Sequence, residues 1–406
     1  PGIDSSLFFD DDGKVYYTGA FDNGIFMSEL EFSYKYDENG KVVDISCKTV
    51  SEKKFIWYGT GGNDPEGPHL YKINGWYYLL ISEGGTEFCH MITVARSRNI
   101  WGEYESCPRN PVFSNRSTSL PIKGTGHMDI VCDQYGDWWG VCLANRPITY
   151  PFKHNLGRET FLVPVEWDDK GWPVIGRNGL LDERISSDRK LFDGVMQKSQ
   201  TDEGKHFHDE FDGDALKKDW NFIYNTTSKY AALDKTKGLL LYGTKEPIIS
   251  SGEIAWVGYR QKHHEFMAET HIDFANMEDG SEAGFTIYMN SKHHYELFTS
   301  VLDGERWLMF RRRIGSLIRE DRISRLADDS IYMRLEALKG ENGENIYCFS
   351  YKENGEWLEA GEGEADYLTT EVGGRFTGNY IALYASGDGK DCRNAVRFDM
   401  FDYIGV

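Results

Sequence analysis

Long apolar runs are missing from this sequence. No stretch approaches the about 18 residues that a membrane-crossing helix needs, so we expect no span through a bilayer. Basic residues are also scarce, because 45 Lys and Arg stand against 65 Asp and Glu and leave a net charge of −20. An acidic surface repels nucleic acid and anionic membranes, which are therefore poor candidates for partners. A neutral ligand such as a sugar meets no such repulsion.

Cysteine is sparse and unpatterned. The seven cysteines are odd in number, scattered along the chain and without a C-x-x-C pair. Neither a zinc site nor a disulfide framework fits such spacing. We expect reduced thiols, and hence a cytoplasmic rather than a secreted protein. The chain opens at Pro1 without an initiator Met, so we expect its natural N-terminus to lie upstream.

Proline is rare as well, with 11 residues against 43 Gly, while aromatic residues reach 14%. Many aromatic residues and glycines with few prolines favour an all-β protein with tight turns. A chain of 406 residues exceeds one ordinary hydrophobic core, so two domains are the default expectation.

Three segments of the chain repeat one another. Residues 6–17, 68–78 and 129–139 each contain an apolar strand, a turn with Gly, and a second strand rich in Trp or Tyr. This pattern predicts a β-hairpin, because Gly supplies the positive φ of a tight turn. The turn glycines of successive repeats lie 62 and 61 residues apart, a spacing that fits propeller blades better than solenoid repeats.

An ionisable residue stands nine positions before each of these turn glycines. The three residues are Asp4, Glu66 and His127. In a propeller the first strand of each blade lines the central axis, so equivalent positions on successive blades converge. We therefore expect the three side chains to meet at the mouth of the channel and form a site. The alternative is that surface strands simply begin with polar residues; three matches of three, each of a catalytic type, favour the site.

The remaining chain divides into further parts. Residues 159–167 predict another strand, and residues 1–181 together make up the blades. Residues 182–206, charged and poor in aromatic residues, are expected to be a surface linker. From 207 to 406, short alternating strands return with turns that contain Gly, a pattern typical of a β-sandwich. The basic run Arg311–Arg313 is expected on a solvated strand rather than in a phosphate site.

Five short motifs carry a family resemblance. They are Gly2-Ile-Asp4, Glu66-Gly-Pro-His-Leu-Tyr71, Ser82-Glu-Gly-Gly-Thr86, Gly124-Thr-Gly-His127 and Leu156-Gly-Arg158-Glu-Thr160. In this order they resemble glycoside hydrolase family 43, in the subgroup of β-xylosidases and α-L-arabinofuranosidases that carry a C-terminal sandwich. The resemblance runs over essentially the whole chain. It implies a five-bladed β-propeller, of which about three blades are present here, followed by a concanavalin-like β-sandwich.

The resemblance implies a role for each matching residue. Glu66 matches the general acid that protonates the leaving oxygen, and Asp4 matches the carboxylate that orients the acid and raises its pKa. Arg158 and Thr86 match positions that bind the sugar in the −1 subsite. His127 matches the axial histidine, which implies substrate contact and a hydrated calcium ion (Ca²⁺) nearby.

Elementary chemistry supports these roles independently of the resemblance. Hydrolysis with inversion needs one protonated and one ionised carboxyl group with room for a water molecule between them. A Glu near its ordinary pKa is ionised at neutral pH, so we expect Asp4 to raise the pKa of Glu66. Arg158 offers bidentate donors suited to vicinal hydroxyls, with a salt bridge to a neighbouring carboxylate as the alternative.

Without the resemblance, His127 is interpreted as a hydrogen-bonded structural residue, because calcium prefers oxygen ligands. His90 is expected to be a buried structural residue, although it follows the pocket motif closely enough to reach the site.

One component of the family is absent from the sequence. Its general base, an Asp in a Pro-Asp-Pro context, has no match in the 406 residues. With roughly 61 residues per blade, roughly 120 residues of a five-bladed propeller are missing. We expect the base to come from an N-terminal part outside this chain, and the chain alone to be inactive until such a fragment completes the propeller. Open edges and an uncovered apolar face are the expected consequence.

The sequence therefore favours an exo-acting, inverting glycoside hydrolase that releases xylose or arabinofuranose from xylan-derived oligosaccharides. The segment around Phe376 resembles the part of the sandwich that reaches toward the active site, which adds Phe376 to the expected substrate-binding residues. Two alternatives stay open. One is a non-catalytic carbohydrate-binding or scaffold protein derived from such an enzyme, and the other is an endo-arabinanase. A homo-oligomer also stays open.

Overall fold

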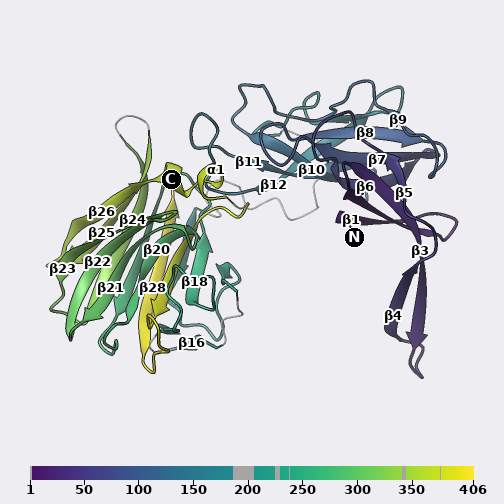
Figure 1. The fold of residues 1–406 in the computed structure, drawn as a ribbon. Helices are drawn as coiled ribbons and strands as arrows, with labels where there is room; N and C mark the ends of the chain where they lie inside the picture. Colours follow the sequence, from purple (N-terminus) through teal and green to yellow (C-terminus); the bar gives the residue numbers. More distant parts are fainter. Residues whose placement is uncertain (1, 186–204, 225–228, 237, 341–343, 375) are drawn as a thin grey trace. The chain divides into compact units, whose positions relative to one another are not determined.

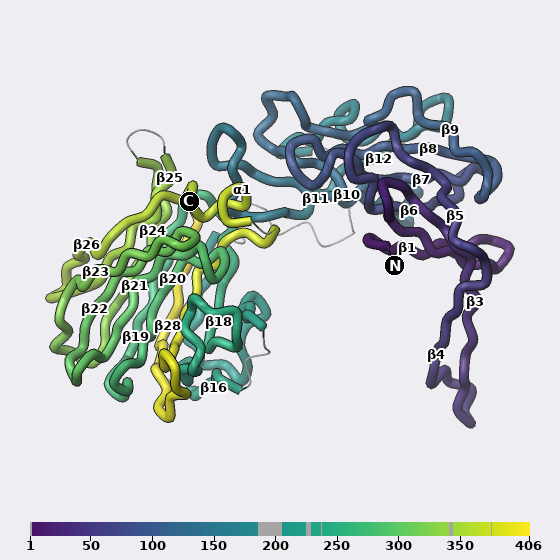
Figure 2. The backbone as a smooth tube through the Cα atoms, in the orientation of Figure 1, coloured from purple at the N-terminus to yellow at the C-terminus, as the bar shows by residue number. Residues whose placement is uncertain are grey.

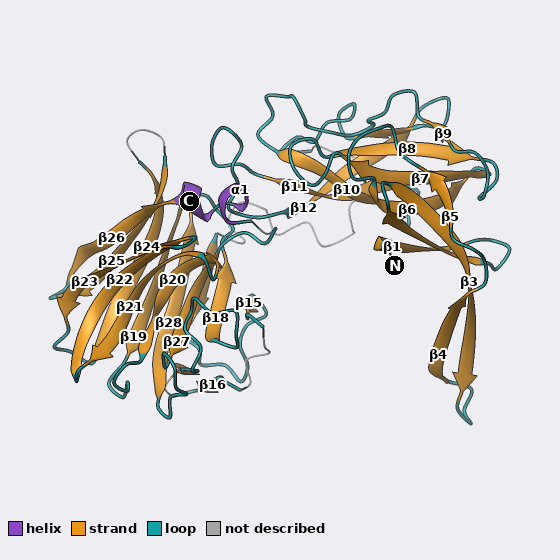
Figure 3. Cartoon of the chain, viewed as in Figure 1, coloured by secondary structure: helices purple, strands orange, loops and turns teal. Residues whose placement is uncertain are grey.

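In the computed structural model the regular secondary structure is almost entirely β-strand (Figure 3). The structure describes residues 2–185, 205–224, 229–236, 238–340, 344–374 and 376–406. No helix within these ranges has the length and apolar character needed to cross a bilayer. The chain divides into two compact units. The first contains Pro1–Arg146 with Arg158–Asp193, and the second contains Pro147–Gly157 with Gly194–Val406.

The first unit consists of three antiparallel sheets that follow one another along the chain (Figure 1). In each sheet the strands pair in sequence order, as in successive blades of a propeller. The first sheet contains β1 (Ile3–Phe9), β2 (Val15–Phe21), β3 (Gly24–Tyr36), β4 (Val42–Thr49) and β5 (Lys54–Trp57), the second β6 (Glu66–Ile73), β7 (Trp76–Glu83), β8 (Met91–Ser97) and β9 (Glu105–Ser106), and the third β10 (Lys123–Cys132), β11 (Trp138–Asn145), β12 (Glu159–Trp167) and β13 (Pro173–Ile175).

The three repeated hairpins are the first two strands of these sheets. β1 and β2, β6 and β7, and β10 and β11 pair antiparallel around Gly13, Gly75 and Gly136. Each of these glycines has a positive φ, of 85°, 74° and 88° in turn, which is the conformation that the tight turn requires. The prediction of hairpins at this spacing is confirmed.

Neighbouring sheets of the first unit pack face to face through apolar side chains. One buried cluster joins Tyr16 and Ile25 of the first sheet to Leu79 of the second. A second cluster joins Leu80 of the second sheet to Val163 of the third. Tryptophans fill the edges of both clusters, as expected for residues between blades: Trp57 and Trp101 in the first, Trp76 and Trp138 in the second.

The opposite face of the first sheet presents apolar side chains to solvent. Ile3, Leu7 and Phe9 alternate along β1 and are 62%, 49% and 64% exposed. The hairpin of β3 and β4 extends away from the other strands of the sheet (Figure 2), and all eight residues of β4 are exposed. A monomer that folds alone rarely leaves such a row of large apolar residues in water. The expected uncovered apolar face is therefore present.

The second unit is a sandwich of two antiparallel sheets (Figure 1). In one sheet the order is β16–β17–β28–β19–β24–β25–β26, with β14 also paired to β28, and in the other it is β15–β18–β27–β20–β21–β22–β23. The strands are β14 (His206–Asp209), β15 (Trp220–Asn221), β16 (Ala231–Asp234), β17 (Gly238–Tyr242), β18 (Ala255–Arg260), β19 (Phe266–Asp273), β20 (Glu282–Asn290), β21 (His293–Leu302), β22 (Glu305–Ile314), β23 (Leu317–Arg325), β24 (Ser330–Lys339), β25 (Asn345–Glu353), β26 (Glu356–Glu364), β27 (Tyr380–Ser386) and β28 (Ala395–Gly405), with the short helices η1 (Ala365–Leu368) and α1 (Thr370–Gly373).

The core of the sandwich lies between its two sheets. Phe285 and Leu383 of one sheet contact a buried cluster that includes Phe349, Phe398 and Tyr403 of the other. Period-two alternation places these residues inward, and polar residues outward, along the same strands. The predicted all-β fold, propeller blades followed by a concanavalin-like sandwich, is confirmed.

One prediction for the sandwich is wrong. Arg311 was expected on a solvated strand, but it is only 9% exposed. Its guanidinium group bridges Glu282 at 2.6 Å, Glu296 at 2.9 Å and Glu320 at 2.7 Å. Alternation along β22 places Arg311 and Arg313 on one face and Arg312 on the other, so a consecutive basic run does not determine the surroundings of each member.

The connection between β11 and β12 belongs to the second unit rather than the first. Lys153 pairs with Asp366 at 2.8 Å, and His154 Nδ1 lies 2.7 Å from Glu371. The amide of Asn155 donates to the buried hydroxyl of Tyr347 at 2.7 Å. The predicted domain bounds, 1–181 and 207–406, remain predictions. Most of the predicted linker, 182–206, lies outside the described residues.

Candidate active site

The same irregularity interrupts the first strand of each sheet in the first unit. Register shifts separate Ile3 from Ser6 in β1, Glu66 from His69 in β6, and Gly126 from Asp129 in β10. Backbones of positive φ stand at these points, at Asp4 (52°), Gly67 (58°) and His127 (49°). A bulge re-aims the side chain beside it, and bulges are frequent next to active sites. The three positions singled out by sequence spacing therefore share one unusual local geometry.

Asp4 lies beside the segment that carries Glu66. The backbone N–H of Gly67 donates to Asp4 Oδ2 at 3.2 Å. Two residues further on, Ser6 Oγ lies 3.2 Å from Nδ1 of His69. These contacts join β1 to β6, so the first and second sheets meet where Asp4 and Glu66 stand.

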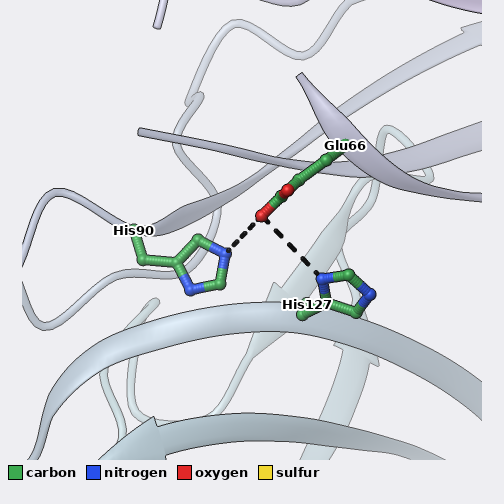
Figure 4. Close-up of side chains that lie close together, drawn as sticks. All are labelled: Glu66, His90 and His127. Carbon is green, nitrogen blue, oxygen red and sulfur yellow. Dashed lines mark ion pairs between the residues drawn. The ribbon is translucent and has the colours of Figure 1, made fainter. Parts of the chain in front are cut away.

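Glu66, His90 and His127 converge in one cluster (Figure 4). Glu66 Oε1 lies 3.6 Å from His90 Nε2 and 3.9 Å from His127 Nδ1. The side chain of His90 is fully buried, whereas those of Glu66 and His127 are 18% and 33% exposed. The carboxylate is thus accessible to a ligand from one side and faces two imidazole rings on the other.

The surroundings hold Glu66 in its ionised form. Burial acts to raise its pKa, but interactions with His127 and His90 outweigh burial and lower the pKa to about 2. The interaction with Glu66 raises the pKa of His127, with burial opposing and Asp4 adding to the increase. The expectation of a raised pKa for Glu66 is therefore wrong: the two histidines lower it, while the carboxylate of Asp4 accepts from Gly67.

A close approach of backbone and ring positions His90. Its Nδ1 lies 3.2 Å from the carbonyl oxygen of Gly124. A Cβ atom at Gly126 would meet the His90 ring at 2.4 Å, so only Gly permits this packing. The backbone N–H of His127 donates to Ser82 Oγ at 2.6 Å. The Gly-x-Gly-His segment of β10 is thereby tied to the second sheet.

His90 is buried, as expected from the sequence, and its ring also reaches the acid, which the sequence had left open as the alternative. The sequence predicted no role for Glu83. Glu83 is completely buried and accepts hydrogen bonds from the backbone N–H groups of Thr60 and Gly62, both at 2.9 Å. It therefore secures the loop that leads to Glu66. The one available signal was position, because Glu83 and His90 both flank the Thr86 motif.

Arg158 and Thr86 also come together. Arg158 Nη1 donates to Thr86 Oγ1 at 3.4 Å, and the charge of Arg158 acts on His127. Arg158 directly follows the segment that packs on the sandwich. Phe376 belongs to the second unit and is 52% exposed. Its role at the site remains a prediction.

The cluster does not fit a directly coordinated calcium ion. Its donors are two imidazole groups and one carboxylate, whereas calcium takes six to eight oxygen ligands. Nε2 of His90 is buried and has no hydrogen-bond partner among the described residues. This atom is a nitrogen, whereas calcium prefers oxygen ligands. Calcium near His127 remains a prediction of the resemblance, and no step of the chemistry below depends on it.

The arrangement is suited to acid–base chemistry on a neutral substrate. A carboxyl group, a histidine with raised pKa and an arginine lie on one partly open surface. His127 Nδ1 lies 3.9 Å from Glu66 Oε1, so the two atoms must come closer, to about 3 Å, before a proton passes between them. All seven cysteines are free thiols, and none is part of this cluster. Cytoplasmic location remains a prediction.

Comparisons with known proteins agree with this geometry. The model of glycosyl hydrolases family 43 matches residues 1–173, and that of the β-xylosidase C-terminal concanavalin A-like domain matches residues 208–404. A non-reducing end α-L-arabinofuranosidase of Bacteroides ovatus is 33% identical over 99% of this chain and 72% of its own length. A xylosidase/arabinosidase of Butyrivibrio fibrisolvens is 35% identical over 99% of this chain and 76% of its own length.

Solved structures show the same likeness. A GH43B protein of the Bacteroides ovatus xyloglucan PUL superposes with a TM-score of 0.83 at 30% identity, over all of this chain and 76% of that one. A xylan β-1,4-xylosidase of Bacillus halodurans superposes with a TM-score of 0.82 at 27% identity, over 99% of this chain and 76% of that one. The chain is a glycosidase and belongs to glycoside hydrolase family 43.

Proposed function

We propose that this protein releases terminal xylose or arabinofuranose from xylan-derived oligosaccharides with inversion, and that Glu66 is the general acid. The observation that carries the proposal is the meeting of Glu66 with two imidazole rings at bulges shared by successive blades. The relatives named as a non-reducing end arabinofuranosidase and as a xylan 1,3-β-xylosidase support a terminal pentose as the substrate.

The proton for the leaving group is held by the pair of Glu66 and His127. In the absence of sugar, Glu66 is ionised and the raised pKa of His127 favours its protonated form. A sugar that excludes water from the pair makes separated charges costly, because the solvation of both is lost. The proton then moves from His127 to Glu66, and the neutral acid donates it to the glycosidic oxygen.

Arg158 and Thr86 orient the sugar. The planar guanidinium group offers parallel donors that match two neighbouring hydroxyls, and the contact with Thr86 at 3.4 Å restrains the arginine. Asp4 accepts from the N–H of Gly67, and its carboxylate favours a cation at His127. These roles concern binding and electrostatics rather than bond formation.

The general base of this proposal is a carboxylate from a segment outside the 406 residues, either joined to the chain or bound as an N-terminal fragment. Inverting hydrolysis requires this second carboxylate to activate water on the opposite face of the sugar. The exposed apolar row of Ile3, Leu7 and Phe9 supports such a segment, because packing another sheet on β1 would remove these side chains from water.

The test compares hydrolysis by the chain alone with hydrolysis after addition of an N-terminal fragment. The fragment is taken from the Butyrivibrio relative and ends at the residue aligned with Pro1. Substrates are xylobiose and the p-nitrophenyl glycosides of xylose and arabinofuranose. We expect activity only with the fragment, and NMR of the first product should show the anomer opposite to that of the substrate. A product with retained configuration would rule out inversion.

Glu66→Gln in the complemented enzyme identifies the acid. The variant should lose hydrolysis of xylobiose by at least 10²-fold, because its leaving group needs a proton. It should keep more activity on p-nitrophenyl glycosides, whose leaving group departs without help. Unchanged rates on xylobiose would remove Glu66 from its role. Sugar binding without turnover, even with the fragment present, would favour the carbohydrate-binding alternative.

A further inference from the structure

Two histidines point to the same side of the first strand of the sandwich. β14 contains His206, Phe207 and His208, and it pairs antiparallel with β28. Phe207 points inward, where its ring stacks on Tyr259 with centroids 4.4 Å apart. Because successive side chains of a strand alternate between faces, this anchor places both histidines on the outer face.

Both imidazole rings face the same carboxylate oxygen. Asp402 lies directly opposite His208 in the register of β14 and β28. Its Oδ1 is 2.7 Å from Nε2 of His206 and 2.9 Å from Nδ1 of His208. The three ligand atoms lie within 4.8 Å of one another. The side chain of Asp402 is 17% exposed, and those of His206 and His208 are 58% and 40% exposed.

A second carboxylate holds the far side of one ring. Oε1 of Glu210 lies 2.8 Å from Nε2 of His208. Glu210 can accept the N–H at Nε2, so a metal ion that displaces the proton between Nδ1 and Asp402 would bind the electron pair of Nδ1. Histidines that bind metals commonly donate their other N–H to a carboxylate in this way, and the carboxylate fixes the tautomer and orientation of the ring.

We propose that His206 Nε2, His208 Nδ1 and Asp402 Oδ1 form a zinc (Zn²⁺) site on the outer face of the sandwich. Glu210 is a positioning residue that orients His208. Two imidazole nitrogens and one carboxylate oxygen, with water as the fourth ligand, are a donor set typical of zinc. Calcium and magnesium are excluded as the main occupants because they take oxygen ligands.

Small side-chain rotations suffice for binding. Tetrahedral zinc with ligand distances of about 2.0–2.2 Å separates its ligand atoms by about 3.3–3.5 Å. The present separations of 2.7 and 2.9 Å from Asp402 Oδ1 are those of hydrogen bonds, so the ion would replace the shared protons and move the rings slightly apart. Both histidines are at least 40% exposed, so their rings have room to move.

The surroundings already favour positive charge at this point. Glu210 Oε1 and Asp402 Oδ1 lie 2.8 and 2.9 Å from the two nitrogens of the His208 ring. A divalent cation benefits from the same two carboxylates. The ion would link β14, where the sandwich begins, to β28, its last strand, and so stabilise the pairing of the two ends of the domain. The site does not depend on the proposed hydrolysis.

A competition titration with a chromophoric zinc chelator tests the site on the full chain. We expect His206→Gln and His208→Gln each to bind one zinc equivalent fewer than the original chain, or to bind it at least tenfold more weakly. Glu210→Gln should weaken binding of that equivalent by about 10- to 100-fold, as expected for a residue that orients a ligand. The comparison is made between variants, so zinc held by thiols or by the cluster around Glu66 cancels.

His271→Gln is the matched control. His271 lies on β19 of the same sheet, and its Nδ1 is 2.6 Å from Asp399, but no second histidine belongs to this pair among the described metal-binding groups. This variant should bind zinc like the original chain. Equal binding by all variants would overturn the site, as would an equal loss in His271→Gln.

Crystals of the original chain soaked in zinc provide a measurement that needs no substitution. Anomalous difference maps at the zinc edge should place an ion between His206, His208 and Asp402. Its absence from that position at saturating zinc would overturn the proposal. Circular dichroism of the metal-free variants checks that each substitution leaves the sandwich folded.

Discussion

Glu66 and His90 face each other at 3.6 Å, between a carboxylate oxygen and an imidazole nitrogen that has no hydrogen-bond partner among the described residues. The side chain of His90 is completely buried, and this nitrogen faces the partly exposed carboxylate of Glu66. A buried polar atom without a partner is costly, and such atoms occur at catalytic sites. His90 thus acts on the acid as well as on the fold.

Removal of the His90 ring should raise the pKa of Glu66. His90→Gln removes one of the two imidazoles that lower this pKa to about 2, and burial, which raises it, remains. Titration of the ¹³C carboxyl signals of labelled Glu should show one signal with an increased pKa. The same signal must be missing from Glu66→Gln, which assigns it.

His69→Gln is the control for this experiment. His69 also lies at the junction of the first two sheets, where Ser6 contacts it, but it is not among the groups that shift Glu66. The pKa of Glu66 should not change in this variant. An equal change in both variants would mean that the effect arises from general rearrangement of the junction.

The pairing of Glu66 with His127 should stabilise the first unit within a defined pH window. The folded pKa of Glu66 is lowered from 4.5 to about 2, so its contribution is complete above 4.5 and disappears as the pH falls toward 2. The folded pKa of His127 is raised above 6.5, so its contribution is complete below 6.5 and disappears as the pH rises through the raised value. Both are complete between pH 4.5 and 6.5.

Thermal unfolding from pH 3 to 9 measures this window. The difference in stability between the original chain and His127→Gln should be largest between pH 4.5 and 6.5 and decrease on both sides. Asp10→Asn is the control. Asp10 pairs with Lys72 at 2.6 Å and is not part of the cluster, so the stability difference for this variant should show no decrease on the alkaline side near pH 7. A difference that stays constant across the range would contradict the pairing.

Gly126→Ala should destabilise the first unit and displace His90. The added Cβ atom would lie 2.4 Å from the ring, so the ring or the β10 bulge must move, at a cost of about 1–3 kcal/mol. Gly136→Ala is the control: the added Cβ would meet nothing within 4 Å, and only the φ of +88° is unfavourable for Ala, which costs about 1–2 kcal/mol. Urea unfolding compares their stabilities. Only Gly126→Ala should alter the pKa of Glu66.

Spacing in the sequence was sufficient to identify Asp4, Glu66 and His127 because the blades repeat. Each residue lies on the first strand of a hairpin whose turn glycine is easily recognised, and in a periodic fold equally spaced residues occupy equivalent positions. The sandwich could also be predicted from the sequence, because apolar and polar residues alternate along its strands and its turns contain Gly.

His90 and Arg311 could not be predicted in the same way, because their surroundings come from distant parts of the chain. His90 reaches Glu66 from the loop before β8, and Gly126 of the next blade makes room for it. Arg311 lies in a basic run, but the three glutamates that surround it come from β20, β21 and β23. The pKa of Glu66 likewise depended on which neighbour came closest, which spacing does not encode.

Arg311→Met should destabilise the sandwich strongly. It leaves Glu282 and Glu296 buried without their cation, and loss of one partner of a buried ion pair costs about 3–5 kcal/mol. Arg312→Met is the neighbouring control, since its contact with Asp321 at 3.4 Å is partly exposed and contributes about 1 kcal/mol or less. Differential scanning calorimetry should show a decreased transition temperature for the first variant alone. Equal effects would mean that the buried cluster is not stabilising.

Arg158→Lys should weaken sugar binding although the substitution keeps the positive charge. Lysine keeps the positive charge but loses the planar pair of donors, and hydrogen bonds to a charged group contribute about 1.5–3 kcal/mol, or roughly 10- to 150-fold in affinity. Thr86→Val removes the oxygen that accepts from Arg158 at 3.4 Å while keeping the shape, so it should weaken binding only a few-fold. Both substitutions are made in the Glu66→Gln background, and binding is measured by titration with xylobiose, which this variant should bind without cleaving.

Arg146→Lys is the matched control, because Arg146 forms two 2.8 Å contacts with Glu159, next to Arg158 in the chain. If Arg146→Lys weakened binding as much as Arg158→Lys, the effect would come from the edge of β12 and not from contact with the sugar.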